Sequence, residues 1–127
     1  MESVYNFIKR KNKQFEHEKK QSKLIRMKDI GRKGQFFFQR ENWVFLPQTN
    51  LNKKVFVLER LRKIKYLGKL AYRGWKRNDI EYRIGYFIVG KIRKAKNRWV
   101  WGQYCPIIPH GDLLRLFQEA KKRKVLL

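Results

Sequence analysis

The 127-residue sequence has few acidic side chains, a single cysteine and no long apolar run. Its one cysteine, Cys105, cannot form an internal disulfide, and together with His17 and His110 it falls short of a structural zinc set. No run reaches the roughly 18–20 apolar residues of a membrane-spanning helix, and the first uncharged stretch is too short for a signal-peptide core. We therefore expect an intracellular protein, cytoplasmic or nucleoid-associated, with no membrane span, disulfide, metal or other cofactor.

The scarcity of acidic residues leaves a large positive charge. Ten Asp and Glu stand against 33 Lys and Arg, a formal net charge of +23. Charge this one-sided resists compaction, so a partner of opposite sign is expected in the working state. Hydrophobic residues at 43% and aromatic residues at 15% still supply a modest core. We expect a folded protein, because wholesale disorder does not fit that apolar content.

Residues 1–34 are predicted to form a basic arm that is partly helical or disordered. Eleven of them are basic and four acidic, and Phe15 is the only large apolar residue between Lys9 and Lys23. That stretch has no face wide enough to bury, so one or two helical turns dock while the middle stays solvated. Gly31 and Gly34 then break the pattern. We place a boundary here, before a compact α+β nucleic-acid-binding domain at residues 35–127.

Two short strands are predicted next, at residues 36–38 and 43–46, on either side of the polar residues 39–42. The following segment, residues 53–64, fits either a helix or a buried strand. We expect a strand in its first half and leave residues 59–63 open.

Apolar and polar residues then alternate with period two in three consecutive runs. The first run extends from Ile64 to Tyr72, the second starts at Tyr82, and the third contains Trp99 and Trp101. This period predicts strands, and the polar segments 76–79 and 94–97 suit turns between them. The runs therefore predict an antiparallel meander. Glycines in and beside the runs are typical of bulges and close backbone approach, which a strongly curved, barrel-like sheet requires.

A C-terminal helix is predicted from the helical spacing of apolar residues between Leu113 and Ala120. Asp112 near its start and lysines near its end match the helix dipole. The predicted fold class is α+β: a curved antiparallel β-meander, packed by this helix and extended by the basic N-terminal arm.

The charge also belongs to the folded part, because residues 35–127 carry 22 basic and 6 acidic side chains. One sign of charge concentrated on a domain favours a polyanionic partner, and we expect nucleic acid, DNA or RNA. The alternative for the hairpin cations is protection of a sheet edge. The candidate nucleic-acid-binding residues are Lys9, Arg10, Lys11 and Lys13 in the arm, Arg60, Arg62, Lys63, Lys65, Lys69, Arg73, Trp75, Lys76 and Arg77 in one stretch, and Lys91, Arg93, Lys94, Lys96, Arg98 and Trp99 in a hairpin.

Aromatic residues lie among these cations, an arrangement typical of proteins that stack single-stranded nucleic acid. Most of them are expected in the core, whereas Trp75 and Trp99, each beside a cation, are expected to be exposed. The predicted function is non-enzymatic binding of the phosphate backbone, with aromatic stacking as a second contribution. The protein would serve as an accessory subunit of a larger protein or nucleoprotein assembly.

Two alternatives stay open. Asp79 and Glu81, with Lys91, resemble in composition the carboxylates and lysine of a small metal-dependent nuclease, although Asp79 also fits a turn and Glu81 an ion pair. The second alternative is an assembly protein of a ribonucleoprotein particle, whose arm would order only in the complex. A pairing of His17 with His110 for acid-base catalysis is disfavoured, and Cys105 is expected to be buried and structural.

Overall fold

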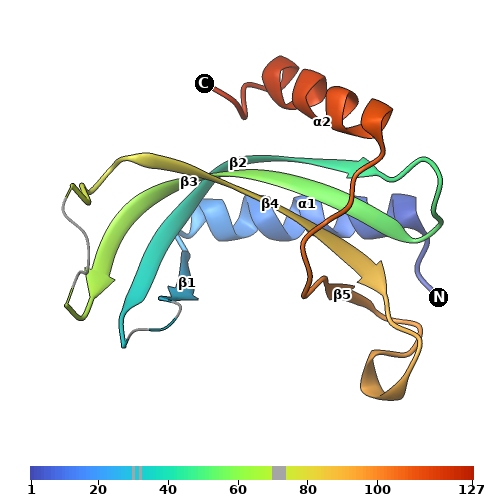
Figure 1. The fold of residues 1–127 in the computed structure, drawn as a ribbon, viewed down its shortest axis with the longest axis horizontal. Coiled ribbons are helices and arrows are strands. Elements are labelled where there is room, and N and C mark those ends of the chain that lie inside the picture. The colour runs from blue at the N-terminus through green and yellow to red at the C-terminus, as the bar shows by residue number, and fades with distance from the viewer. Residues whose placement is uncertain (30, 32, 70–73) are drawn as a thin grey trace.

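The computed structural model describes residues 1–29, 31, 33–69 and 74–127, which form two α-helices and a five-stranded antiparallel sheet. The sheet curls into a half-barrel (Figure 1), which confirms the predicted α+β fold. The strands, hydrogen-bonded in sequence order, are β1 (Leu24–Lys28), β2 (Gln35–Pro47), β3 (Lys54–Leu67), β4 (Ile80–Val89) and β5 (Trp99–Trp101). The helices are α1 (Val4–Lys20) and α2 (His110–Lys122), and a short 3₁₀ turn, η1 (Arg93–Ala95), lies between β4 and β5.

β2 is one long strand, so the prediction of two short strands is wrong. Its polar middle stays in the sheet because Arg40 and Glu41 form ion pairs with side chains of β3. The pairing with β3 shifts between Phe37 and Phe38 and again between Arg40 and Asn42. Such bulges bend a strand and increase its twist. The polar residues that were expected to break the strand therefore mark a bend.

β3 continues through residues 59–63 and includes the alternating run that starts at Ile64. Leu70 and Tyr72, the later positions of that run, lie outside the described residues. The other two runs form β4 and β5, each antiparallel to its neighbour. Asn78 and Asn97 have left-handed φ values of 75° and 60° in the two connections. Asparagine tolerates this conformation, which is why these polar segments turn.

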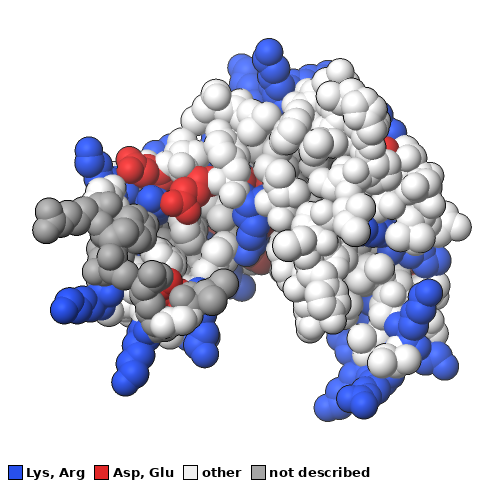
Figure 2. Space-filling view, viewed as in Figure 1, with Lys and Arg blue, Asp and Glu red and all other residues white. Residues whose placement is uncertain are grey.

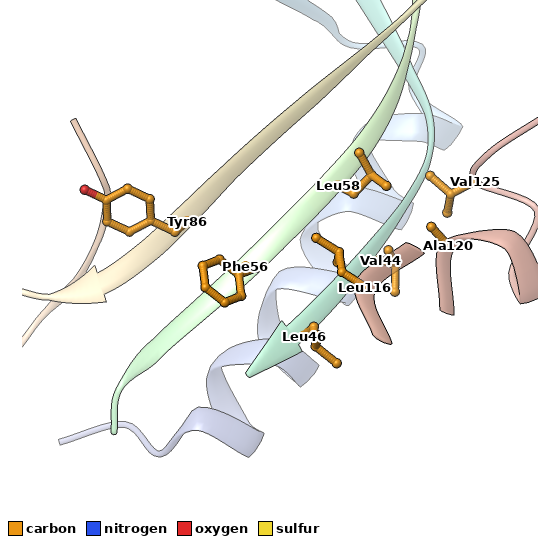
Figure 3. Close-up of a cluster of buried hydrophobic side chains, with 8 residues drawn as sticks. All are labelled: Val44, Leu46, Phe56, Leu58, Tyr86, Leu116, Ala120 and Val125. Atoms are coloured by element: carbon orange, nitrogen blue, oxygen red, sulfur yellow. The ribbon is translucent and has the colours of Figure 1, made fainter. Parts of the chain in front are cut away.

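Strands β2, β3 and β4 bury side chains on both faces of the sheet. Since successive side chains point to opposite faces, such strands have continuous apolar runs, like those at residues 43–46 and 55–58. One face packs against α2 in the cluster that Figure 3 shows: Val44, Leu46, Phe56, Leu58, Tyr86, Leu116, Ala120 and Val125. The other face packs against α1: Phe7, Phe15, Trp43, Phe45, Val55, Val57 and Phe87.

The N-terminal segment forms one continuous helix, α1, longer than the one or two turns that were predicted to dock, while most side chains from Lys9 to Lys23 are exposed. The helix starts with a cap, in which the Asn6 N–H donates to Ser3 Oγ at 3.1 Å. Phe7 and Phe15 are both buried, so two aromatic rings eight residues apart hold the helix on the sheet. β1 adds a fifth strand beside β2. Independent folding of residues 35–127 stays a prediction. Of the helices in the described part of the chain, neither has the length and apolar character to cross a membrane.

Candidate nucleic-acid interface

Residues 90–98, here called the basic hairpin, connect β4 to β5 and fold back on themselves. The Gly90 N–H donates to the Arg98 carbonyl oxygen at 2.9 Å, and the Asn97 N–H donates to the Gly90 carbonyl oxygen at 3.0 Å. A Cβ at residue 90 would overlap the backbone of Ala95, so this close approach requires glycine. The loop is therefore a compact, hydrogen-bonded projection from the sheet (Figure 1).

Five cations cover the basic hairpin: Lys91, Arg93, Lys94, Lys96 and Arg98. All five are exposed, and within the described residues none takes part in an ion pair. Figure 2 shows Lys and Arg side chains gathered at the lower right, where the hairpin projects in Figure 1. The structure therefore brings together every cation that the sequence assigned to this hairpin.

A second group of cations lies at the opposite end of the sheet, where β1 and β3 finish and β2 and β4 begin. We call this the loop end. Arg73, a predicted member, lies outside the described residues. The exposed cations here are Arg26, Lys28, Lys33, Lys65, Lys69, Lys76 and Arg77. Arg26, Lys28 and Lys33 were not among the sequence candidates. For Lys33, its place in the connection between β1 and β2, beside Gly34, is the signal that could have identified it.

Three of the predicted cations act within the fold. Arg62 donates through Nε to Glu41 Oε2 at 2.6 Å, and Arg60 donates to Glu41 and to the carbonyl oxygens of Lys124 and Val125. Lys63 is buried and pairs with Glu81. The hydrogen bond from Arg62 holds the pKa of the Glu41 carboxyl below its ordinary value.

The four cations that were predicted on the N-terminal segment divide into two pairs. Lys9 and Lys13 are exposed. Arg10 is exposed too but forms a two-pronged ion pair with Glu2, at 2.8 and 2.9 Å, which lowers the pKa of Glu2. Lys11 is partly buried, and its burial lowers its pKa. Only Lys9 and Lys13 are thus exposed without an ion pair to another described residue.

Trp99 is not the exposed stacking residue that the sequence predicted. Its ring stacks on Phe7, with centroids 4.3 Å apart and planes 14° apart, and its Nε1–H donates to the Glu2 carbonyl oxygen at 3.0 Å. Trp75 is partly exposed, and its Nε1 has no hydrogen-bond partner among the described residues. The structure therefore uses Trp99 to hold α1 and leaves Trp75 near the cations of the loop end.

The residues of the nuclease alternative do not meet. Asp79 and Glu81 lie where β4 begins, whereas Lys91 follows the other end of this ten-residue strand, roughly 30 Å away at about 3.3 Å per residue. The Glu81 carboxylate binds Lys63 Nζ at 2.9 Å. In the described part of the chain, no three His, Cys, Asp or Glu side chains gather as metal ligands would. Cys105 is exposed, so its predicted burial is wrong.

Arginine neutralises most of the acidic side chains inside the fold. The pairs are Glu2 with Arg10, Glu18 with Arg40, Glu41 with Arg60 and Arg62, Glu59 with Arg40 and Arg83, Asp112 with Arg115, and Glu119 with Arg123. Lysine supplies the cation for Glu81. Among the described residues, none of these pairs involves a cation of the basic hairpin, whereas Asp29, Asp79 and Glu81 lie among the cations of the loop end.

Comparison of this chain with protein-family models, with curated proteins and with solved structures finds no match.

Proposed function

We propose that this protein binds nucleic acid through the phosphate backbone, without catalysis, as an accessory subunit of a larger nucleoprotein complex. The observation that carries the proposal is the basic hairpin, with five exposed cations on a compact loop that contains no acidic residue. Lysine and arginine that contact phosphates release condensed counterions, and this release supplies most of non-specific binding. Lysines outnumber arginines in the chain, which favours backbone contact over bidentate reading of bases.

The loop end offers a second set of phosphate contacts. It is separated from the basic hairpin by the length of β3, whose 14 residues span at most about 46 Å at 3.3 Å per residue. That length corresponds to roughly 13 base pairs of duplex at 3.4 Å per step. One nucleic acid of this size can therefore contact both ends of the sheet.

An uncharged surface supports the role as a subunit. No charged residue occurs between Trp99 and Gly111, and Tyr104 and Ile107 in this segment are 82% and 84% exposed. Leu114 and Phe117 on α2 are exposed as well. Figure 2 shows uncharged side chains over much of this face. Exposed apolar patches of this kind mark protein contacts, so the partner protein would bind here and leave the basic hairpin to nucleic acid.

A fluorescence anisotropy titration tests the proposal. Labelled single- and double-stranded DNA and RNA are titrated with the protein at 50 and 200 mM salt, and each nucleic acid is examined on a gel afterwards. We expect intact nucleic acid and an affinity that falls about 10³–10⁵-fold over this salt range if 6–10 phosphates are contacted. Affinity that barely changes with salt, or no binding to any of the four, would overturn the proposal.

A further inference from the structure

A hollow of about 390 Å³ lies at the base of the basic hairpin. Its apolar lining residues are Leu51, from the connection between β2 and β3, Ile88 and Val89, at the end of β4, and Met1. Lys53, Lys91 and Lys96 also line it, together with Asn97. Its volume lies within the range of small-molecule sites, roughly 300–1,000 Å³. The lining of the hollow therefore combines apolar residues with three lysines.

Backbone hydrogen bonds hold the walls of the hollow in place. The Val89 N–H donates to the Lys53 carbonyl oxygen at 3.3 Å, which links β4 to the connection before β3. The hydrogen bonds between Gly90, Asn97 and Arg98 hold the hairpin side. Little of the backbone has to become ordered when a ligand enters, which reduces the entropic cost of binding.

The lining identifies the chemistry of the ligand. Within the described residues, none of the three lysines has an ion-pair partner, so their charge is available to an anion. A simple anion would gain nothing from Leu51 and Ile88, and a purely apolar ligand would gain nothing from the charge of three lysines. A nucleotide has both parts, because its base has an apolar face and its phosphate is an anion.

We propose that this hollow receives one unpaired nucleotide of the bound strand. The inference rests on the proposed function and adds to it a preference for unpaired nucleotides. The base lies over Leu51 and Ile88, the flanking phosphates face Lys91 and Lys96, and the Asn97 amide is available to a base edge. A base in a duplex must first leave its stack and its partner. Single strands, loops and ends therefore bind more tightly than a fully paired duplex of equal charge.

The test compares two single strands of 12 nucleotides, one normal and one with abasic residues throughout, in DNA and in RNA form. The two strands of each form have the same phosphates, so only the base distinguishes them. We expect the wild-type protein to bind the normal strand about tenfold more tightly. Leu51→Ala should reduce this ratio severalfold while the affinity for the abasic strand and the salt dependence stay unchanged. Leu114→Ala is the control, because Leu114 is 51% exposed and Leu51 is 46% exposed.

The outcomes separate the two proposals. Equal affinity for normal and abasic strands overturns the nucleotide site and leaves phosphate binding intact. A ratio that Leu51→Ala does not change also overturns the site, because the base then binds elsewhere. Loss of binding to every strand overturns the proposed function itself. If thermal melting shows that Leu51→Ala is unfolded, Asn97→Gly replaces it, since glycine accepts the φ of 60° at this position.

Discussion

The indole of Trp101 on β5 occupies the space that a side chain at residue 85 on β4 would need. Gly85 thus makes room for the ring, which also lies 4.8 Å from the Arg83 guanidinium. The reverse arrangement exists at Gly102, whose missing side chain leaves space for the ring of Tyr86. Two glycines and two aromatic rings therefore join β4 to β5, a strand of three residues. This contact anchors β5, the strand at which the basic hairpin ends.

Gly85→Ala should displace the Trp101 ring. Overpacking of a filled site of this kind typically costs about 1–3 kcal/mol. We expect a decrease of this size in the free energy of unfolding in urea, with a change in tryptophan fluorescence of the folded protein. Gly111→Ala is the control, because a Cβ there meets open space and alanine is the better helix former. Equal stability of Gly85→Ala and the wild type would contradict the described packing.

Glu59→Gln should be among the most destabilising single substitutions in this chain. The Glu59 carboxylate is fully buried and binds Arg40 at 2.9 Å and Arg83 at 2.5 Å. Its neutralisation leaves the guanidinium of Arg40, itself almost buried, without a full counter-charge. Loss of one partner of a buried pair costs about 3–5 kcal/mol.

Chemical denaturation measures this loss at neutral pH. Glu119→Gln is the matched control, since Glu119 and its partner Arg123 are both exposed, and such pairs contribute about 0.2–1 kcal/mol. Similar losses in the two variants would show that burial does not govern the Glu59 network.

Glu41 should make the free energy of unfolding depend on pH in the acid range. Hydrogen bonds from Arg62 lower the pKa of Glu41 in the folded protein below 4.5, its ordinary value. A carboxyl group whose pKa is lowered in the folded state stabilises the protein above pH 4.5. This stabilisation is lost as the pH falls through the pKa of the folded state. Glu41→Gln should therefore cost about 1–2 kcal/mol at pH 7, and this difference should shrink below pH 4.5. Urea midpoints of both proteins from pH 3 to 7 provide the measurement. A difference that is constant over this range would exclude the ion pair as its cause.

Three lysines of the basic hairpin should contribute directly to the salt dependence of binding. The triple variant Lys91→Gln, Lys94→Gln, Lys96→Gln removes three exposed charges and should reduce the slope of log affinity against log salt by about 2.7 for duplex DNA. The control triple Lys121→Gln, Lys122→Gln, Lys124→Gln removes the same charge from the end of α2 and the turn that follows it. Equal reductions in both triples would mean that net charge, and not the hairpin, determines binding.

Phe7→Ala should release α1 from the sheet. Phe7 is fully buried against Phe87 and Trp99, and a buried Phe→Ala change costs about 3–5 kcal/mol. We expect limited proteolysis to cut within residues 4–20 before the rest of the chain. Tyr5→Ala on the same helix, at a side chain that is 73% exposed, should resist as the wild type does. The fragment that remains also tests whether the sheet and α2 stay folded without α1.

The sequence predicted elements wherever one periodic signal determined them. Period two identified β4 and β5, and the spacing from Leu113 to Ala120 identified α2. α1 was underestimated because its buried face is narrow and Phe15 is surrounded by polar residues. The length of β2 was missed because Arg40 looks like a loop residue until its partner Glu59, 19 positions later, lies beside it. Pairings at this separation are set by tertiary structure and leave no local pattern.

The candidate site was predictable in its loops and not in its strands. The basic hairpin kept all five of its cations exposed because a projecting turn has no neighbours to bind them. Arg60, Arg62 and Lys63 carry the same charge in the sequence, yet acidic residues on adjacent strands engage them. Charge counts alone do not distinguish these two situations.

Arginine and lysine occupy different places in this structure, and the difference has a chemical consequence. Arginine holds most of the internal ion pairs, whereas lysine supplies three of the five cations of the basic hairpin. Acetylation removes the charge of lysine and leaves arginine untouched. A reagent or enzyme that acetylates exposed amines would therefore weaken binding to a polyanion, while the folded chain keeps most of its internal ion pairs.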